Sequence, residues 1–284
     1  MIRPEIERVV SLALAEDAPW GDITSEVLIP QEATATAALV AREAGVLSGI
    51  DAFEVAMTSF DRGVTVTRFA DDGEAFAAGD TIAEVAGHAR SLLRAERVAL
   101  NLVQRMSGIA TQTRRFVDEV AGTRARIVDT RKTTPGLRAL ERHAVRCGGG
   151  HNHRFSLSDA VLAKDNHLAV LTAGGRSITE VLLEARARLP HTTHLEVEVD
   201  RIDQIEPVLA AGVDTIMLDN FTLEQLRDGV ALVAGRAIVE ASGSVSLATV
   251  RAIAGTGVDV ISVGALTHSV RALDLGLDMV VTTP

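Results

Sequence analysis

The chain has 284 residues, 47% of them hydrophobic, which is enough for one large domain or for one large and one small domain. Its net charge of −10 and pI of 5.3 exclude a nucleic-acid-binding class that needs a broad basic surface. The single Cys147 excludes an internal disulfide, and no apolar run approaches the roughly 18 residues of a membrane span. Because acidic residues interrupt the N-terminal segment, it does not resemble a signal peptide, and we expect a cytoplasmic protein.

The first part of the chain predicts a small sheet with helices. Apolar residues recur at helical spacing over residues 4–16. Residues 33–42 and 64–70 predict strands, residues 51–60 a short helix, and residues 71–87 further short strands. Apolar residues near a 3.6 period over 90–119 predict two helices broken around Ser107 and Gly108, where we place a domain boundary.

A strand–helix alternation follows this boundary. The predicted strands are 125–130, 160–166, 194–200, 214–220, 237–243 and 258–264. The predicted helices are 136–146, 178–189, 202–212, 222–235 and 246–257. Strands that are apolar on both faces argue for a parallel sheet, and their number and spacing favour a closed βα barrel over an open doubly wound sheet. The tail 266–284 is able to join either domain.

Polar residues end several of these strands, and in a βα barrel the strand ends meet at one mouth. The polar residues at or near the ends are Asp129, Thr130, Arg131, Lys132, Lys164, Asp165, Asn166, His167, Glu196, Glu198, Asp219, Asn220, Glu240 and Ser242. Glu196 and Glu198 are two apart and share one strand face. The role of Glu196 stays open between the pore and a structural ion pair with Arg or Lys.

A cationic stretch lies within this acidic chain. Residues 129–167 contain seven Lys or Arg against four acids, a net +3 in a chain of −10. Such charge beside the backbone N–H groups of Gly148–Gly150 suits a small ligand with several negative charges. The SGS segment at 242–244 and the VGA segment at 263–265 match the phosphate site on the last two strands of a barrel.

The sequence predicts a binding site with two sides. Glu198 and Asp219 are suited to hold ribose hydroxyls or a magnesium ion. The cationic side opposite them consists of Arg131, Lys132, His153, Arg154 and Lys164. The sequence therefore predicts a phosphorylated sugar that faces a carboxylate-bearing partner.

Six segments carry a family resemblance. They are DTRKTTPGLR, GGGHNHR, LAKDNH, VEV, MLDN and SVGALTHS. In this order they resemble the quinolinate phosphoribosyltransferases, which are also called carboxylating nicotinate-nucleotide pyrophosphorylases. EDAPWGDITS and ERVALNLVQRMSGIAT extend the resemblance to nearly the whole chain. It implies an α/β fold with a small N-terminal α/β sandwich domain over 1–108, which the tail 266–284 is able to join, and an irregular βα barrel with fewer than eight strands over 109–265.

The resemblance also implies the site residues. Those that bind the pyridine carboxylates and the phosphoribosyl group are Arg97, Thr130, Arg131, Lys132, His153, Arg154, Lys164, Glu198 and Asp219. Arg97 matches an arginine that reaches the neighbouring subunit's site, which implies at least a homodimer. Lys132, Lys164, Glu198 and Asp219 are expected to act in catalysis, with Mg²⁺ near the two acids.

The phosphate-binding backbone is implied in the same way. It comprises Ser242, Gly243, Ser244, Val263, Gly264 and Ala265. The sequence departs from the family at Ser244, where glycine or asparagine is expected. We expect Ser244 to keep this role if its φ is negative, because backbone N–H groups do the binding.

The implied reaction transfers the phosphoribosyl group of phosphoribosyl pyrophosphate to quinolinate. It yields nicotinate mononucleotide, pyrophosphate and CO2, a step of NAD biosynthesis, with Mg²⁺ as cofactor. No nucleic acid or membrane partner is expected.

Four alternatives remain open at this stage. A Schiff-base aldolase would use Lys164 as its nucleophile. A metal hydrolase would use His151 and His153 as ligands. A non-catalytic relative would serve binding in anion or metal uptake, and a salvage transferase would take nicotinate in place of quinolinate.

Overall fold

The computed structural model describes residues 3–282. They form two compact units, which we call the first unit and the barrel unit. Among the described residues, the first unit comprises 3–114, 133–149 and 266–282, and the barrel unit comprises 115–132 and 150–265. The tail thus lies in the first unit, as does the segment 133–149, which the sequence analysis had placed in the barrel.

The first unit is built around an antiparallel sheet with the strand order β12-β1-β5-β3. Its strands, with the separate pair β2 and β4, are β1 (Thr34–Ala41), β2 (Gly45–Val46), β3 (Thr65–Arg68), β4 (Ala75–Phe76), β5 (Thr81–His88) and β12 (Leu275–Thr282). Its helices are α1 (Arg3–Asp17), α2 (Ile23–Leu28), α3 (Ile50–Thr58), α5 (Arg138–Cys147), α11 (Ala265–His268) and most of α4 (Ala89–Glu119). Alternate residues of β1 (Ala35, Ala37 and Leu39) are buried, which is the pattern of a half-covered sheet.

The predicted break near residues 107–108 was wrong, because α4 is one continuous helix. A Cβ on Gly108 would lie 2.2 Å from the backbone oxygen of Arg271, so this glycine allows a close approach of the chain and does not end the helix. Ser107 is buried and donates its hydroxyl to the Ser48 oxygen at 3.2 Å. Packing, not helix termination, explains both residues.

Helix α5 follows the first barrel strand in sequence but packs within the first unit. Its Glu141 is 1% exposed and accepts a hydrogen bond from Nε of Arg105, on α4, at 2.9 Å. The Thr134 backbone N–H donates to the other carboxylate oxygen at 3.1 Å. This buried carboxylate fixes the helix, since removing either partner would leave an unpaired charge.

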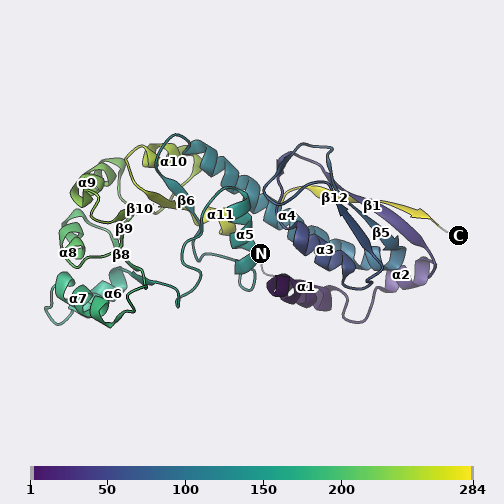
Figure 1. Cartoon of the computed structure of the whole chain (residues 1–284), viewed down its shortest axis with the longest axis horizontal. Coiled ribbons are helices and arrows are strands. Elements are labelled where there is room, and N and C mark those ends of the chain that lie inside the picture. Colours follow the sequence, from purple (N-terminus) through teal and green to yellow (C-terminus); the bar gives the residue numbers. More distant parts are fainter. Residues whose placement is uncertain (1–2, 283–284) are drawn as a thin grey trace. The chain divides into compact units, whose positions relative to one another are not determined.

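The barrel unit contains six parallel strands in the order β6-β11-β10-β9-β8-β7. They are β6 (Arg126–Val128), β7 (Val161–Ala163), β8 (Leu195–Val199), β9 (Thr215–Asp219), β10 (Ile238–Ser242) and β11 (Val260–Ser262). Its helices are α6 (Asp165–Thr172), α7 (Ile178–Arg188), the short 3-10 helix η1 (Ile202–Gln204), α8 (Ile205–Leu209), α9 (Leu223–Val233) and α10 (Leu247–Ala254). Helices α7–α10 line the outer side of the strands (Figure 1). The prediction of a βα arrangement with fewer than eight strands is confirmed.

The edge of β6 receives an additional segment. Val128 forms a parallel bridge with His151, whose N–H donates to the Ile127 oxygen at 2.8 Å. The segment after the three glycines therefore lies beside β6 and carries His153 towards the interior. At the other edge, β7 ends at Ala163, earlier than expected, and α6 begins at Asp165.

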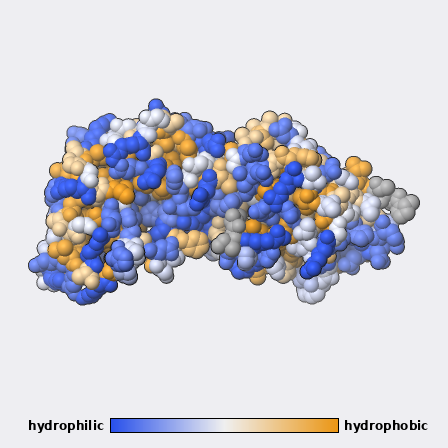
Figure 2. Space-filling model, in the orientation of Figure 1, coloured by the Kyte–Doolittle hydropathy of each residue, from blue (hydrophilic) through white to orange (hydrophobic). Residues whose placement is uncertain are grey.

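Hydrophilic residues gather over the area that β6 and β8–β10 surround, on the face shown in Figure 2. None of the helices in the described part of the chain is long and apolar enough to cross a membrane.

Candidate active site

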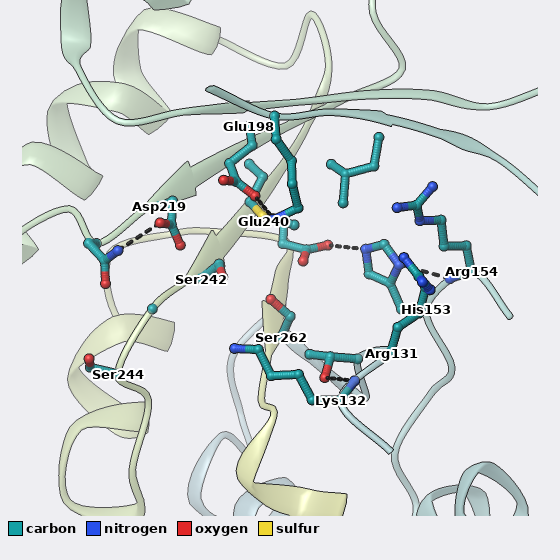
Figure 3. A pocket seen from close by; sticks show the side chains of 16 residues that line it. Arg131, Lys132, His153, Arg154, Glu198, Asp219, Glu240, Ser242, Ser244 and Ser262 are labelled. Carbon is teal, nitrogen blue, oxygen red and sulfur yellow. Dashed lines mark hydrogen bonds and ion pairs between the residues drawn. The ribbon is translucent and has the colours of Figure 1, made fainter. Parts of the chain in front are cut away.

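A pocket of about 460 Å³ opens in the barrel unit. It is lined by Thr130, Arg131, Lys132, His153, Arg154, Leu162, Lys164, Glu198, Met217, Asp219, Asn220, Glu240, Ser242, Gly243, Ser244 and Ser262. Arg131, His153 and Arg154 lie on one side of it, and Asp219, Ser242 and Ser244 on the other (Figure 3). The pocket thus brings together most of the residues that the sequence analysis singled out.

Strand periodicity supplies the acidic and hydroxyl groups. Residues two apart point to the same face of a strand. On β9 this pairs Met217 with Asp219, and on β10 it pairs Glu240 with Ser242, all four in the pocket lining. The pattern agrees with the shared face predicted for the glutamates of β8.

The cationic side is held by a buried carboxylate at the end of β6. Asp129 is fully buried; its Oδ2 accepts from Nδ2 of Asn152 at 2.6 Å, and its Oδ1 accepts from the backbone N–H of His153 at 2.8 Å. Charge-assisted hydrogen bonds of this kind fix a loop firmly. The end of β6 and the segment that carries His153 and Arg154 are therefore held together.

Two guanidinium groups share this side of the pocket. Burial lowers the pKa of Arg154, and the neighbouring charge of Arg131 lowers it further. Nη1 of Arg154 donates to the Ala160 oxygen at 3.0 Å, which orients the side chain. Since like charges close together are unfavourable, an anion placed between them is stabilised by both.

Lys164 and Glu198 form an ion pair at the end of β7 and β8. Nζ lies 2.7 Å from Oε2, and the carboxylate is 12% exposed while the lysine is 48% exposed. The lysine thus presents a charged ammonium group held by a more buried acid.

Beneath the pocket, His153 meets two buried carboxylates. Its Nε2 lies 3.1 Å from Oε2 of Glu196 and 3.6 Å from Oε2 of Glu240. The Arg154 backbone N–H donates to Nδ1 at 2.8 Å, so the proton on Nε2 faces the two carboxylates. Burial lowers the pKa of His153, but hydrogen bonds with Glu196 and Glu240 outweigh burial and raise this pKa to about 10. Burial raises the pKa of Glu240, and the charge of Glu196 also raises it, so Glu240 keeps its proton beyond the ordinary range. The partner of Glu196 is thus a histidine, where the sequence analysis had weighed Arg or Lys.

The phosphate side has a strained backbone. Gly243 has φ +98°, and a Cβ there would lie 2.1 Å from Oδ1 of Asn220. Ser244 has φ +49°, so the condition set for its phosphate-binding role, a negative φ, is not met. Asn220 also has a positive φ, 57°, and its N–H donates to the Ser242 oxygen at 2.9 Å. The turn after β10 requires left-handed geometry, which serine adopts at a cost of about 1–2 kcal/mol.

Four predicted site residues do not line this pocket. They are Arg97, Val263, Gly264 and Ala265. The Val263 backbone N–H donates to the Val128 oxygen at 3.0 Å, so it serves the sheet and is unavailable to a phosphate. Arg97 is exposed on α4, within the first unit. His151, weighed as a metal ligand with His153, is exposed and does not belong to the group formed by His153, Glu196 and Glu240.

Sequence reasoning placed Asn220 and Glu240 at the mouth of the barrel without giving them a role. It did not find the lining residues Leu162, Met217 and Ser262. Glu240 carried a signal, because a glutamate inside the apolar run AIVEASG sits on the same strand face as Ser242. Ser262 lies likewise within the apolar run of the last barrel strand.

Glu198 and Asp219 fit a magnesium ion that arrives with its substrate. Mg²⁺ is usually bound by one or two carboxylates together with substrate phosphates. Oδ2 of Asp219 accepts from Nδ2 of Asn220 at 2.7 Å, which orients it. Neither acid belongs to a group of three metal-ligating side chains within residues 3–282.

Known proteins match this chain over almost its whole length. The C-terminal domain of quinolinate phosphoribosyl transferase matches residues 109–278, and its N-terminal domain matches residues 22–107. The nicotinate-nucleotide pyrophosphorylase [carboxylating] of Mycobacterium leprae is 45% identical over 276 residues, covering 94% of each chain. The probable enzyme of the same name from Bacillus subtilis is 40% identical, covering 97% of this chain and 93% of its own length.

Solved structures also match the chain over almost its whole length. The crystal structure of NadC from Streptococcus pyogenes has a TM-score of 0.94 at 41% identity, covering 100% of this chain and 99% of the other. The nicotinate-nucleotide pyrophosphorylase of Francisella tularensis has a TM-score of 0.91 at 38% identity, covering 98% and 97%. On matches that span nearly its whole length, the chain belongs to the quinolinate phosphoribosyl transferase family.

Proposed function

We propose that this chain transfers the phosphoribosyl group of phosphoribosyl pyrophosphate to quinolinate and releases pyrophosphate and CO2, giving nicotinate mononucleotide for NAD biosynthesis. The observation that carries the proposal is the two-sided pocket. Cations at the end of β6 and in the segment after it face acids and a serine–glycine turn from β8–β10. A pyridine diacid and a phosphorylated sugar need these two kinds of surface side by side.

Quinolinate is held by the cationic side. Arg131 and Arg154 take its carboxylates, with the Lys164 ammonium group beside them. Guanidinium groups bind carboxylates through paired charge-assisted hydrogen bonds, each worth about 1.5–3 kcal/mol. The mutual repulsion of the two guanidinium groups is relieved by the dianion, so the empty site favours this ligand.

The sugar phosphate lies on the opposite side. The turn after β10 is suited to the 5′-phosphate at Ser242 and Gly243, because glycine lets backbone N–H groups approach closely. Ser244 also lines the pocket, but its positive φ does not meet the condition stated for its role. Glu198 and Asp219 face the ribose hydroxyls. Lys132, exposed at the pocket, compensates the charge of the departing pyrophosphate.

The bond changes balance without a covalent enzyme intermediate. The bond from ribose C1 to pyrophosphate breaks, and the pyridine nitrogen donates its electron pair to C1. The ring becomes a positively charged pyridinium. The carboxylate on the adjacent ring carbon then leaves as CO2, and its electron pair stays on that carbon until a proton arrives. Orientation of the two reactants is the main contribution of the site.

Mg²⁺ completes the proposal. It would be held by Glu198 and Asp219 and would neutralise the diphosphate charge. Removing the ion with a chelator should abolish turnover, and Asp219→Asn should raise the Mg²⁺ concentration needed for half-maximal rate. If chelator-treated protein stayed fully active, the ion would have no part in the reaction.

The deciding experiment measures nicotinate mononucleotide and CO2 from quinolinate, phosphoribosyl pyrophosphate and Mg²⁺ with the purified chain. Nicotinate in place of quinolinate is the matched control, since it lacks the carboxylate that leaves. Product formation with quinolinate but not with nicotinate supports the proposal. Product formation with nicotinate but not with quinolinate would assign the salvage reaction instead.

The site gives less support to a Schiff-base aldolase. An amine nucleophile is usually desolvated and kept neutral. Lys164 is instead exposed and paired with Glu198 at 2.7 Å. Failure of borohydride to trap a keto substrate on Lys164 would remove this alternative.

We further propose that the chain works in the cytoplasm as a homodimer or higher oligomer in which Arg97 serves the neighbouring subunit's pocket. The support is that Arg97 is exposed on α4 and takes no part in its own chain's pocket lining. Mixing inactive Arg97→Ala chains with inactive Arg154→Ala chains tests this, because a mixed dimer regains one intact site. No recovery of activity in the mixture would refute the exchange, and cell fractionation tests the location.

A further inference from the structure

A second cluster of reactive side chains lies in the first unit, and none of its residues lines the pocket. Asp72 precedes β4, while His143 and Cys147 are four residues apart on one face of α5. One ligand atom from each, nitrogen, sulfur and oxygen, lies within 4.8 Å of the other two. Nothing in the proposed reaction uses them.

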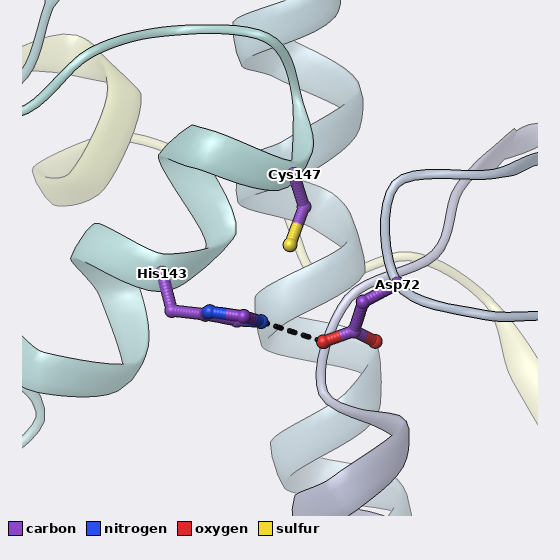
Figure 4. Close-up of side chains that lie close together, drawn as sticks. All are labelled: Asp72, His143 and Cys147. Carbon is purple, nitrogen blue, oxygen red and sulfur yellow. Dashed lines mark hydrogen bonds and ion pairs between the residues drawn. The ribbon is translucent and has the colours of Figure 1, made fainter. Parts of the chain in front are cut away.

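The orientation of the three groups distinguishes a metal site from a nucleophile. Nε2 of His143 lies 2.6 Å from Oδ2 of Asp72. In Figure 4 the Cys147 sulfur points to the side of the imidazole that faces Asp72. A cysteine nucleophile with a histidine relay would have the thiol and the carboxylate on opposite ring nitrogens. Here the three donors converge on one point, as ligands do around an ion.

A supporting layer of hydrogen bonds orients the donors. The backbone N–H groups of Gly49 and Ile50 donate to Oδ1 of Asp72 at 2.8 and 3.0 Å, which leaves Oδ2 directed at the cluster. The hydroxyl of the buried Ser48 donates to the Cys147 sulfur at 3.3 Å. Such outer contacts are typical of metal centres, where they fix the ligands and favour the thiolate.

Burial agrees with this assignment. The side chains of His143 and Asp72 are 23% and 17% exposed, so the cluster is shielded but reachable by an ion.

We propose that Asp72, His143 and Cys147 form a binding site for one zinc-class divalent ion, with one position open to water. The nitrogen–sulfur–oxygen set matches the ligands that zinc takes, at bond lengths of about 2.0–2.3 Å. Ligand atoms around such an ion stand roughly 3.3–3.8 Å apart, so the histidine and the carboxylate must separate by about 1 Å on binding. The site would tie α5 to the loop before β4 within the first unit.

Cobalt(II) titration of the full chain tests the proposal, because Co²⁺ replaces zinc and a thiolate ligand gives a near-ultraviolet charge-transfer band. We expect one Co²⁺ per chain with this band, displaced by Zn²⁺. Cys147→Ser should abolish the band and weaken binding about 100-fold, and Ser48→Ala should weaken it about 10-fold. The matched control is His88→Asn, because His88 pairs with Asp61 at 2.8 Å in the same unit without a cysteine.

Two results would overturn the site. One is a titration without a charge-transfer band in the unsubstituted chain. The other is equal Co²⁺ affinity in the unsubstituted chain and Cys147→Ser, which would place the ion elsewhere, for example at His153, Glu196 and Glu240. Alkylation of Cys147 by iodoacetamide gives an independent readout, since Zn²⁺ should slow it at least tenfold in the unsubstituted chain and in His88→Asn.

Discussion

The buried group of His153, Glu196 and Glu240 predicts that two similar substitutions have different effects. Glu240 is 3% exposed and burial raises its pKa, which favours the protonated carboxyl, so Glu240→Gln supplies a neutral group of the same shape. Glu196 accepts from the histidine Nε2 at 3.1 Å, so Glu196→Gln removes a charged acceptor. The two substitutions should therefore differ although both glutamates contact the same ring.

The magnitudes follow from these contacts. A hydrogen bond to a charged group is worth about 1.5–3 kcal/mol, which is the expected loss for Glu196→Gln. Glu240→Gln should cost less than about 1 kcal/mol at pH 6. For a chain of this size 1 kcal/mol corresponds to roughly 2 °C in Tm, so the expected losses are about 3–6 °C and under 2 °C.

The pH dependence provides a second readout. Burial raises the pKa of Glu240 above its ordinary value of 4.5. The folded chain therefore holds a proton that the unfolded chain has released, and stability falls as the pH rises from that ordinary value through the raised one. Glu240→Gln cannot titrate there, so the stability of this variant should rise relative to that of the unsubstituted chain as the pH increases above 4.5.

Scanning calorimetry at pH 6, 7.5 and 9 measures all three proteins, with the exposed Glu224→Gln as control. The control should stay within about 0.5 kcal/mol of the unsubstituted chain. Equal losses in Glu196→Gln and Glu240→Gln, with parallel pH profiles, would refute the assigned protonation. A lower kcat/KM for quinolinate in Glu196→Gln, by tenfold or more, would link His153 orientation to binding.

Three further predictions concern other parts of the chain. Arg154→Ala should lower kcat/KM for quinolinate about 100-fold in steady-state assays, whereas near-normal kinetics would remove Arg154 from the site. Ser244→Gly should raise stability by about 0.5–1 kcal/mol in denaturant titrations while activity persists, because glycine adopts its φ of +49° without strain; a loss of stability would contradict this. Gly108→Ala should lower Tm by several degrees, because the added Cβ would lie 2.2 Å from the backbone oxygen of Arg271, and an unchanged Tm would show that this contact relaxes freely.

The barrel unit was largely predictable from the sequence, because apolar runs alternate there with helical periods. The strand ends then placed Glu198, Asp219 and Ser242 at one mouth without any knowledge of contacts. The family resemblance supplied the identity of the reaction, which composition and spacing alone left at a sugar phosphate beside a carboxylate-bearing partner.

The remaining features depend on contacts between distant residues. Gly108 resembled a helix break, and only its approach to Arg271 shows that it permits packing. The placement of α5 in the first unit depends on the buried Glu141 and its partner Arg105, which lies 36 residues away in the sequence. The positive φ of Ser244 likewise follows from the turn after β10 and not from the preference of serine.

The buried acids of the barrel unit argue that its interior serves binding more than stability. Barrel interiors are usually filled by branched apolar side chains, and replacing a buried ionic group by apolar residues is often neutral or stabilising. Glu196 and Glu240 each keep one buried oxygen without a hydrogen-bond partner among the described residues. The free-energy cost of these two unpaired oxygens is explained if the acids orient His153. The segment that carries His153 reaches the interior along the β6 edge, where it forms the bridge with Val128. The β6 edge and the acidic interior therefore act together, because the edge pairs with the segment that carries Arg154 and the acids orient the histidine of that segment.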